Sequence, residues 1–425
     1  MTQTMSALNV TPAADPGRWP DIAAVPRCPF RAAVARALFT RNADRLPVRV
    51  TGPGRVAFGA GKTGSPVLTL HRPADFYQRI GAAGLIGFGE SYMAGDWDCD
   101  DLTGLLTAFA SQVGTLVPRP LQALRRFYVR RAPAASDASE ENARRNIHHH
   151  YDLSNELFAL FLDETMTYSA GLFREADDGA PIAASILLAD AQRRKIDRLL
   201  DLAEVGPSSR VLEIGTGWGE LAIRAAARGA QVLTVTLSEE QRALAAERIE
   251  RAGLAGRAVV ELRDYRQVTG EFDAILSVEM IEAVGARYWP DYFAALSRLL
   301  APGGRVGLQS ITMPHRRMMA TRYTQTWVLK YVFPGGLIPS VTAIERGTAR
   351  AGLRVAGQRD FGAHYAETLR LWRERFCAAE AEVALLGFDE VFRRMWLLYL
   401  CYAEAGFRSG YLDVAQLLLV KGGSE

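Results

Sequence analysis

Short apolar, β-branched segments alternate with helix-like segments in the second half of the chain, from about residue 205. Seven such segments can be identified, and they lie at 210–215, 231–236, 258–262, 274–278, 305–310, 353–358 and 415–421. Alternation of strands and helices is typical of a mainly parallel sheet that helices cover on both faces. The pattern therefore predicts an α/β fold for this half of the chain.

A long segment, 312–349, separates the fifth predicted strand from the sixth. It is rich in aromatic residues and arginine, and it is longer than a simple crossover requires. In folds of this class, ligands bind at the carboxyl ends of the strands. We expect this segment to form a helical cap over that edge of the sheet.

The sequence before residue 143 divides into three parts by composition. Residues 1–25 are rich in Pro, Ala and Asp and predict a disordered terminus. Residues 26–131 mix helical and short strand patterns and predict a smaller α+β domain. Residues 132–142 are small and polar and predict a linker to a domain over 143–425. Beside the linker, "RPLQALRRFYVRRAP" (119–133) places arginines next to an apolar stripe, which favours a short basic helix at a membrane surface.

Composition narrows the classes of function. A net charge of +3 is too small to suggest nucleic-acid binding, which needs a concentrated basic surface. The four cysteines lie far apart, which fits a reducing cytoplasm and predicts no zinc site. The N-terminus lacks a basic start followed by an apolar run, and no run of about 18 apolar residues occurs. We expect a cytoplasmic protein whose contact with the inner face of the membrane is peripheral.

A glycine-rich turn follows the first predicted strand, in "EIGTGWGELAIRAAARG" (213–229). Gly215 and Gly217 allow positive φ angles and a close approach of the backbone to a ligand. The spacing differs from the G-x-G-x-x-G of NAD enzymes, and the second predicted strand ends in Thr236 rather than in an acidic residue. The turn thus favours a nucleotide cofactor other than NAD, and a purely structural turn is the alternative. Gln241 also has capping-box spacing with Ser238, so a structural role stays open for it.

Three consecutive histidines occur in "RRNIHHHYDLSNELF" (144–158). Adjacent residues of a helix cannot all face one ion, because residues on one helix face are spaced three or four apart. No later HxxxE or HxxxH completes a ligand set. The sequence therefore predicts no metal site, and we interpret this stretch as part of a lid.

From about residue 140 to its end, the chain resembles the cyclopropane fatty acid synthase and mycolic acid methyltransferase family. The resemblance rests on "HHYDLSNELFALFLDETMTYSAGLF" (149–173), "VLEIGTGWGELAIRAA" (211–226), "VTLSEEQRALA" (235–245), "LRDYR" (262–266), "SVEMIEAVG" (277–285), "FPGGLIPS" (333–340) and "FGAHYAETLRLWRERF" (361–376). In addition, "GFGESYMAGDWDC" (87–99) resembles the N-terminal domain of bacterial cyclopropane synthases. The resemblance implies a Rossmann-like, seven-stranded class I methyltransferase fold with a helical cap, and a homodimer.

The resemblance also implies S-adenosylmethionine as the cofactor. Tyr168 and Ser169 are then expected at its methionine end, and the turn around Glu213 is expected to approach it closely. The other implied cofactor residues are Gly215 and Gly217 in that turn, Thr236 and Gln241 near the ribose and adenine, and Asp264 and Tyr265 beside the adenine.

Enzymes of this family methylate an alkene of a fatty acyl chain. The attack needs alignment and exclusion of water, and the resulting carbocation favours a nearby negative group before a base removes a proton. Glu282 follows the fourth predicted strand and is the expected negative group. In the resembled synthases the matching glutamate holds a bicarbonate base together with a histidine and a tyrosine, and Tyr365 matches that tyrosine.

The chain departs from the cyclopropane synthases at three positions, where Ala170, Ala283 and Gln309 replace a cysteine and two histidines. These changes put bicarbonate and ring closure in doubt. They bring the chain closer to the tuberculostearic acid (10-methylstearate) methyltransferases, which implies a methylene product and a separate reductase. Cyclopropane synthesis and non-catalytic lipid binding are the alternatives. Phospholipid head groups are expected to meet arginines of the cap, namely Arg316, Arg317 and Arg322.

Overall fold

The computed structural model describes residues 14–112, 154–176 and 179–422. The predicted basic helix at 119–133, the linker at 132–142 and the three histidines lie outside the described residues. The described residues fall into two compact units. One contains the glycine-rich turn and comprises residues 154–323, Phe333–Arg375 and the segment from Leu412. The other comprises residues 14–112, Thr324–Val332 and Phe376–Tyr411.

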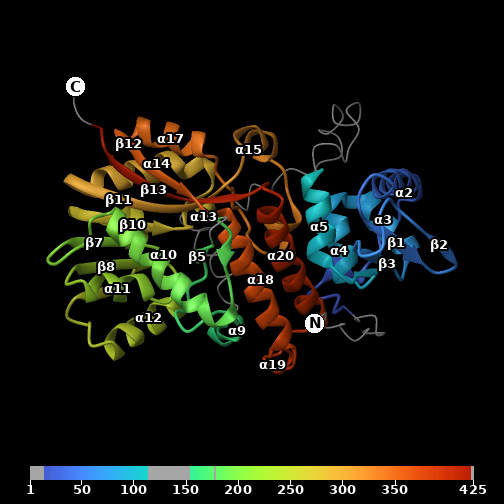
Figure 1. Cartoon of the computed structure of the whole chain (residues 1–425), viewed down its shortest axis with the longest axis horizontal. Coiled ribbons are helices and arrows are strands. Elements are labelled where there is room, and N and C mark those ends of the chain that lie inside the picture. Colours follow the sequence, from blue (N-terminus) through green and yellow to red (C-terminus); the bar gives the residue numbers. More distant parts are fainter. Residues whose placement is uncertain (1–13, 113–153, 177–178, 423–425) are drawn as a thin grey trace. The chain divides into compact units, whose positions relative to one another are not determined.

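The first unit, here called the sheet unit, is built on a seven-stranded sheet (Figure 1). Its strand order is β12-β13-β11-β10-β7-β8-β9, and only β13 runs antiparallel to its neighbours. All seven predicted strands are present, and the predicted α/β fold is confirmed. The strands are β7 (Arg210–Ile214), β8 (Gln231–Thr236), β9 (Ala258–Leu262), β10 (Phe272–Val278), β11 (Leu300–Thr312), β12 (Leu353–Asp360) and β13 (Asp413–Lys421).

Helices cover both faces of this sheet. Successive residues of a strand point to opposite faces, so neighbouring residues pack against different helices. Val211 and Leu276 pack with α10 (Leu188–Leu202), α11 (Glu220–Ala227) and α12 (Glu239–Arg251). Leu212 and Ile275, one residue away in each strand, pack instead with α14 (Trp289–Leu299) and α17 (Val341–Arg350). These two hydrophobic layers hold the carboxyl ends of the parallel strands in place.

Shorter elements complete the sheet unit around the carboxyl edge. They are α9 (Asn155–Phe161), β5 (Arg174–Glu175), β6 (Pro181–Ile182), η2 (Ser185–Leu187), η3 (Tyr265–Gln267), α13 (Ile281–Val284), η4 (Ala286–Tyr288), α15 (His315–Thr321) and most of α18 (Gly362–Ala378). Ser154 begins α9 by accepting a hydrogen bond from the Leu157 amide at 3.3 Å.

The second unit combines a four-stranded sheet, in the order β2-β1-β3-β4, with helices. Its strands are β1 (Arg49–Gly52), β2 (Arg55–Phe58), β3 (Val67–Leu70) and β4 (Trp97–Cys99). Its helices are α1 (Pro20–Ala23), α2 (Pro29–Ala43), α3 (Pro73–Ala83), α4 (Leu85–Met93), α5 (Leu102–Ser111), α16 (Trp327–Tyr331), α19 (Glu380–Leu385) and α20 (Glu390–Arg408). The domain boundaries at 26–131 and 143–425 stay a prediction.

Two segments distant in sequence belong to this second unit. Helix α20 packs on α4 and α5, and its buried Arg394 donates to the carbonyl oxygens of Tyr92 at 2.6 Å and Trp97 at 3.0 Å. Helix α16 comes from the predicted cap segment, and its Trp327 ring donates to the Met93 sulfur at 3.3 Å. Of the predicted cap, α15 and α17 belong to the sheet unit and α16 to the second unit. None of the described helices combines the length and apolarity needed to cross a bilayer.

Candidate active site

The glycine-rich turn opens at the carboxyl end of β7 and leads into α11. Gly215 has a φ of 95°, and a Cβ there would lie 2.5 Å from Cγ of Met280, so no larger residue fits. Gly217 also has a positive φ, 52°, but a Cβ there would meet no described atom within 4 Å. The backbone at Gly217 therefore faces open space. This is the arrangement that a ligand lying against the turn requires.

The end of β8 carries a buried polar pair. The hydroxyl of Thr236 donates to Oε1 of Gln241 at 2.8 Å, while Ser238 caps α12 by accepting from the Gln241 amide at 3.2 Å. The predicted cap at Ser238 is thus present, and the Gln241 side chain turns to Thr236. Both predicted residues therefore lie at the carboxyl edge of the sheet beside the turn.

Asp264 and Tyr265 follow β9. The Asp264 carboxylate accepts two bonds from the Arg266 guanidinium, at 2.8 and 2.6 Å, and Tyr265 packs edge-on against Tyr292. Arg266 therefore neutralises the Asp264 carboxylate. Direct contact of Asp264 and Tyr265 with adenine stays a prediction.

Buried charges lie behind the turn. The Lys195 ammonium is 1% exposed and donates to the hydroxyl of Ser169 at 2.6 Å. Burial lowers the pKa of Lys195 to about 8, although the carboxylates of Glu279, Asp163 and Glu213 oppose the shift. Burial raises the pKa of Glu213 to about 8, and its Oε2 has no hydrogen-bond partner among the described residues. The Lys195 bond holds Ser169 in position beside the turn.

Aromatic rings form a wall around Tyr168. The Tyr168 ring stacks on Trp372 with centroids 5.1 Å apart and meets Phe158 edge-on at the same distance. Phe158 also packs on Trp218 of the glycine-rich turn at 4.9 Å, and Trp218 donates to Asn155 of α9 at 2.7 Å. These rings bring α9, the turn and α18 together and exclude water from this side of the site.

A carboxylate that the sequence analysis did not single out lies at the end of β10. Oε1 of Glu279 accepts from the backbone amide of Ala170 at 3.0 Å and from the Gln309 side chain at 2.9 Å. Its Oε2 accepts from the Tyr365 hydroxyl at 2.7 Å. Glu279 has a φ of 53°, a conformation that costs a non-glycine residue about 1–2 kcal/mol. Strain of this kind concentrates at functional sites.

Gln309 is oriented by a second glutamine. Its Oε1 accepts from the Gln416 amide at 3.0 Å, so its own amide is directed at Glu279. Gln416 also donates to the carbonyl of Lys195 at 3.0 Å and accepts from Arg198. Both glutamines are fully buried. The network fixes the amide orientation at the site.

Glu282, the predicted negative group, lies beside Glu279 but has other partners. Its Oε1 accepts from the Ser310 hydroxyl at 2.9 Å and the Ile311 amide at 2.6 Å. Its Oε2 is buried and has no partner among the described residues. Burial and the charge of Glu279 raise the pKa of Glu282 to about 8. The pKa of Glu279 is also raised, chiefly by burial, although its three hydrogen-bond donors and Lys195 oppose this shift.

The structure brings Tyr365, Gln309 and Ala170 together around Glu279, and their catalytic roles stay a prediction. The partners of Glu282 are instead the Ser310 hydroxyl and the Ile311 amide. One signal in the sequence pointed to Glu279. It is a charged residue directly after a buried strand, at the edge where ligands bind in this class of fold. Ala283, the third of the residues that differ from those of the cyclopropane synthases, is exposed.

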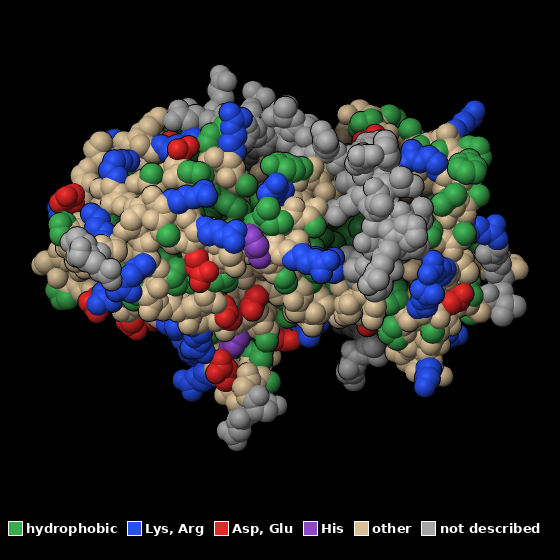
Figure 2. Space-filling model, turned by 90° about the horizontal axis from the view of Figure 1, so that it is seen from above, with side chains coloured by type: hydrophobic (Ala, Val, Ile, Leu, Met, Phe, Trp, Pro, Cys, Tyr) green, Lys and Arg blue, Asp and Glu red, His purple; other side chains and the backbone are tan. Residues whose placement is uncertain are grey.

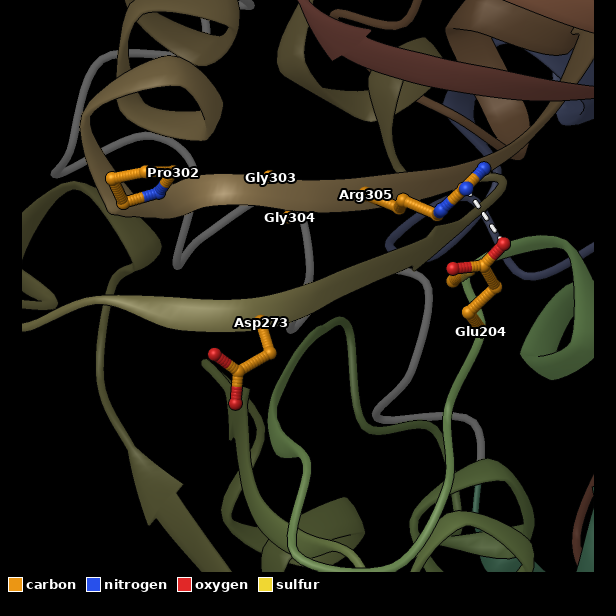
Figure 3. Close-up of a pocket in the computed structure, with 7 residues that line it drawn as sticks. Glu204, Asp273, Pro302, Gly303, Gly304 and Arg305 are labelled. Carbon is orange, nitrogen blue, oxygen red and sulfur yellow. Dashed lines mark ion pairs between the residues drawn. The ribbon is translucent and has the colours of Figure 1, made fainter.

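A separate pocket lies at the opposite edge of the sheet (Figure 3). Asp273 and Arg305, which line it, stand near the amino ends of the paired portions of β10 and β11, whereas Glu279 follows the carboxyl end of β10. Arg305 and Glu204, which both line this pocket, form an ion pair at 2.6 Å. The pocket is therefore remote from the predicted chemistry. In the described parts of the chain, no three His, Cys, Asp or Glu side chains are grouped to hold a metal ion.

The strand order, the open glycine-rich turn and the buried polar residues at the carboxyl edge define a class I methyltransferase that uses S-adenosylmethionine. The residues fit this cofactor, because Gly217 leaves space at the turn and Glu213 keeps an unpartnered carboxylate oxygen beneath it. The chain belongs to the mycolic acid cyclopropane synthetase family, whose pattern matches residues 138–417. It is a methyltransferase of lipid acyl chains.

Three relatives place the chain within this family. It is 56% identical to tuberculostearic acid methyltransferase UfaA1 of Mycobacterium tuberculosis, over 99% of this chain and 98% of that protein. It is 34% identical to cyclopropane-fatty-acyl-phospholipid synthase of Escherichia coli, over 82% of this chain and 86% of the synthase. Among solved structures, the cyclopropane synthase MmaA2 from Mycobacterium tuberculosis superposes with a TM-score of 0.59 at 30% identity. That match covers 65% of this chain and 98% of MmaA2.

Proposed function

We propose that the enzyme methylates the double bond of a monounsaturated, oleoyl-type acyl chain in a membrane phospholipid. The proposed product is a 10-methylene fatty acyl chain, the precursor of a 10-methyl branch. The observation that carries this proposal is the hydrogen-bonded carboxylate of Glu279, which lies at the carboxyl edge together with an aromatic wall. The 56% identity to a tuberculostearic acid methyltransferase supports the choice of product.

The site provides what methylation of an alkene requires. S-adenosylmethionine, when bound, supplies a methyl group on a positively charged sulfur. The rings of Tyr168, Trp372 and Phe158 exclude water, which would otherwise trap the carbocation. A carboxylate about 5 Å from that cation, at an effective dielectric of about 20, stabilises it by roughly 3 kcal/mol. We assign this role to Glu279, and Glu282, whose pKa is raised to about 8, lies beside it.

The second candidate function is closure of a cyclopropane ring on the same acyl chain. It is supported by the 34% identity to the cyclopropane synthase of Escherichia coli. A ring and a methylene branch are isomers and both require the loss of one proton, so the fold does not separate them. The alanines at positions 170 and 283 and the glutamine at 309 are the features that favour the methylene product.

Access to a phospholipid requires contact with a membrane surface, and we assign that contact to α15 and the residues after it. Met319 and Tyr323 are 42% and 69% exposed, and Arg316 and Arg322 are exposed beside them. Figure 2 looks onto the side of the sheet unit that carries α15 and α17, where Lys and Arg side chains lie among hydrophobic ones. Basic and apolar groups together favour an anionic bilayer. A homodimer and a partner reductase are further parts of the proposal.

The test is an incubation of the purified protein with S-adenosylmethionine and vesicles of oleoyl phosphatidylglycerol. The released fatty acids are examined by proton NMR, because mass alone does not distinguish the isomers. Vinylidene protons are the expected result. Upfield ring protons would show that the enzyme is a cyclopropane synthase. A protein that binds S-adenosylmethionine but turns over no lipid would contradict both candidate functions.

A further inference from the structure

Three donors from three separate segments converge on the Glu279 carboxylate. They are the Ala170 amide before α10, the Gln309 side chain on β11 and the Tyr365 hydroxyl on α18, at 3.0, 2.9 and 2.7 Å. Three such donors around one planar oxyanion form an anion site. In this chain the anion is a side chain of the protein itself.

Bicarbonate does not fit this arrangement. In the resembled synthases, a histidine and a tyrosine hold bicarbonate next to a glutamate. Here the groups at the two matching positions, Gln309 and Tyr365, already donate to Glu279. A bicarbonate ion nearby would lose these donors and would lie close to two carboxyl groups, those of Glu279 and Glu282, which disfavour a further negative charge. Lys195 is a buried cation whose charge acts on Glu279. Its ammonium already donates to the Ser169 hydroxyl.

We propose that the Glu279 carboxylate is the base that removes the final proton, and that the enzyme needs no bicarbonate. This inference rests on the proposed methylation of an acyl chain. The reaction class of the enzyme does not depend on it, because either base is compatible with the same product.

The loss of the proton needs no reactant other than the substrate cation and Glu279. After methyl transfer, a hydride moves to the neighbouring cationic carbon, so the positive charge lies on the carbon that carries the new methyl group. One C–H bond of that methyl group then breaks, and its electrons form the C=C bond of the methylene product. The proton goes to a carboxylate oxygen of Glu279. The substrate loses its positive charge, and Glu279 loses its negative charge.

Geometry favours Glu279 over Glu282 as the acceptor of this proton. The three donors stabilise the charged form of Glu279, which is the form that accepts a proton. Burial still raises the pKa of Glu279, against the effect of these donors and of Lys195. A base with a raised pKa receives a proton more readily than an ordinary glutamate does. Glu282 has a buried oxygen without a partner among the described residues, and this oxygen is suited to hold the proton of a neutral carboxyl group.

The decisive variant is Glu279→Gln, which keeps the size and much of the hydrogen bonding but removes the base. We expect kcat to fall by about 100-fold or more, with unchanged affinity for S-adenosylmethionine in calorimetry. Glu345→Gln, at an exposed position of α17, is the matched control. In Glu279→Ala the three donors are released, and we expect added bicarbonate or formate to restore turnover. A Glu279→Gln enzyme within about threefold of the wild-type kcat would overturn the proposal.

A binding measurement tests the wild-type protein independently of any variant's activity. Carbon-13 NMR of labelled bicarbonate is expected to show no line broadening by the wild-type protein and clear broadening by Glu279→Ala. Broadening by the wild type that Tyr365→Phe abolishes would contradict the inference, as would stimulation of wild-type turnover by bicarbonate. If the wild type forms no lipid product at all, the proposed function fails rather than the assignment of the base.

Discussion

The Gln416 amide donates to Oε1 of Gln309 at 3.0 Å, and this bond determines which end of Gln309 faces Glu279. With its oxygen occupied, Gln309 presents an N–H to the carboxylate. Without that bond, the amide can turn and present its oxygen, which would repel the carboxylate. Gln416 therefore acts on the proposed base through Gln309, by orienting a donor that stabilises the charged form of Glu279.

We expect Gln416→Met to lower kcat by about 10-fold while leaving the affinity for S-adenosylmethionine unchanged. The acid limb of the pH–rate profile should shift upward, because Glu279 loses a donor that stabilises its charged form. Gln358→Met, at an exposed position of β12, is the control. A merely structural role would lower the melting temperature without moving the pH profile, and that outcome would contradict the positioning role.

Gly217→Ala tests the cofactor turn. The added methyl group meets no described atom within 4 Å, but it enters the space assigned to the cofactor. We expect a loss of at least about 10-fold in affinity for S-adenosylmethionine in calorimetry, with only the small loss of stability that a positive φ causes. Gly253→Ala is the matched control. Gly253 also has a positive φ, 71°, and a Cβ there would meet no described atom within 4 Å. Equal affinities of the two variants would place the cofactor elsewhere.

Stability should fall as pH rises from about 5.5 to 7.5. Glu213 and Glu282 keep protons in the folded protein, where the pKa of each is raised to about 8, and lose them in the unfolded chain near pH 4.5. The folded state therefore binds more protons in this range, and each retained proton contributes about 1.4 kcal/mol per pH unit. Urea unfolding at several pH values measures the slope. Glu282→Gln should make the decline shallower, whereas Glu345→Gln should leave the slope unchanged.

The double variant Arg316→Glu with Arg322→Glu tests the membrane contact. Each basic residue near an anionic bilayer contributes about 1 kcal/mol, so reversing two charges should weaken vesicle binding by at least about 10-fold. Sedimentation with phosphatidylglycerol vesicles gives the measurement, and the difference should shrink at high salt. Arg242→Glu with Arg251→Glu, on α12, makes the same charge change at another exposed site. Equal loss in both double variants would show a general charge effect and contradict the assignment to α15.

The seven strands and the cofactor turn were predictable because they depend on local patterns. The strands are short β-branched segments that helix-like segments separate, and the turn has its glycines where the backbone adopts positive φ angles. Gly215 also requires its glycine because of Met280, a contact that no local pattern indicates.

The partners of Tyr365 could not be predicted in the same way. Glu279 was overlooked because its position depends on a left-handed residue that turns the chain after β10. That turn directs the carboxylate to donors that are 30, 86 and 109 residues away in sequence. Periodicity and spacing report local conformation, whereas a hydrogen-bonded cluster of this kind depends on tertiary packing. The resemblance to the synthases pointed to Glu282, which lies beside Glu279, and its catalytic role stays a prediction.

Helix α20 has a consequence for how this enzyme could have arisen. The chain leaves the sheet unit after residue 375, contributes α20 to the second unit and returns for β13 at residue 413. The buried residues Phe392, Trp396 and Leu400 of α20 lie in the unit that contains α4 and α5. A gene encoding only the methyltransferase region would therefore produce a helix whose apolar face has lost its partners. Loss or gain of the N-terminal region therefore requires matching changes on the apolar face of α20.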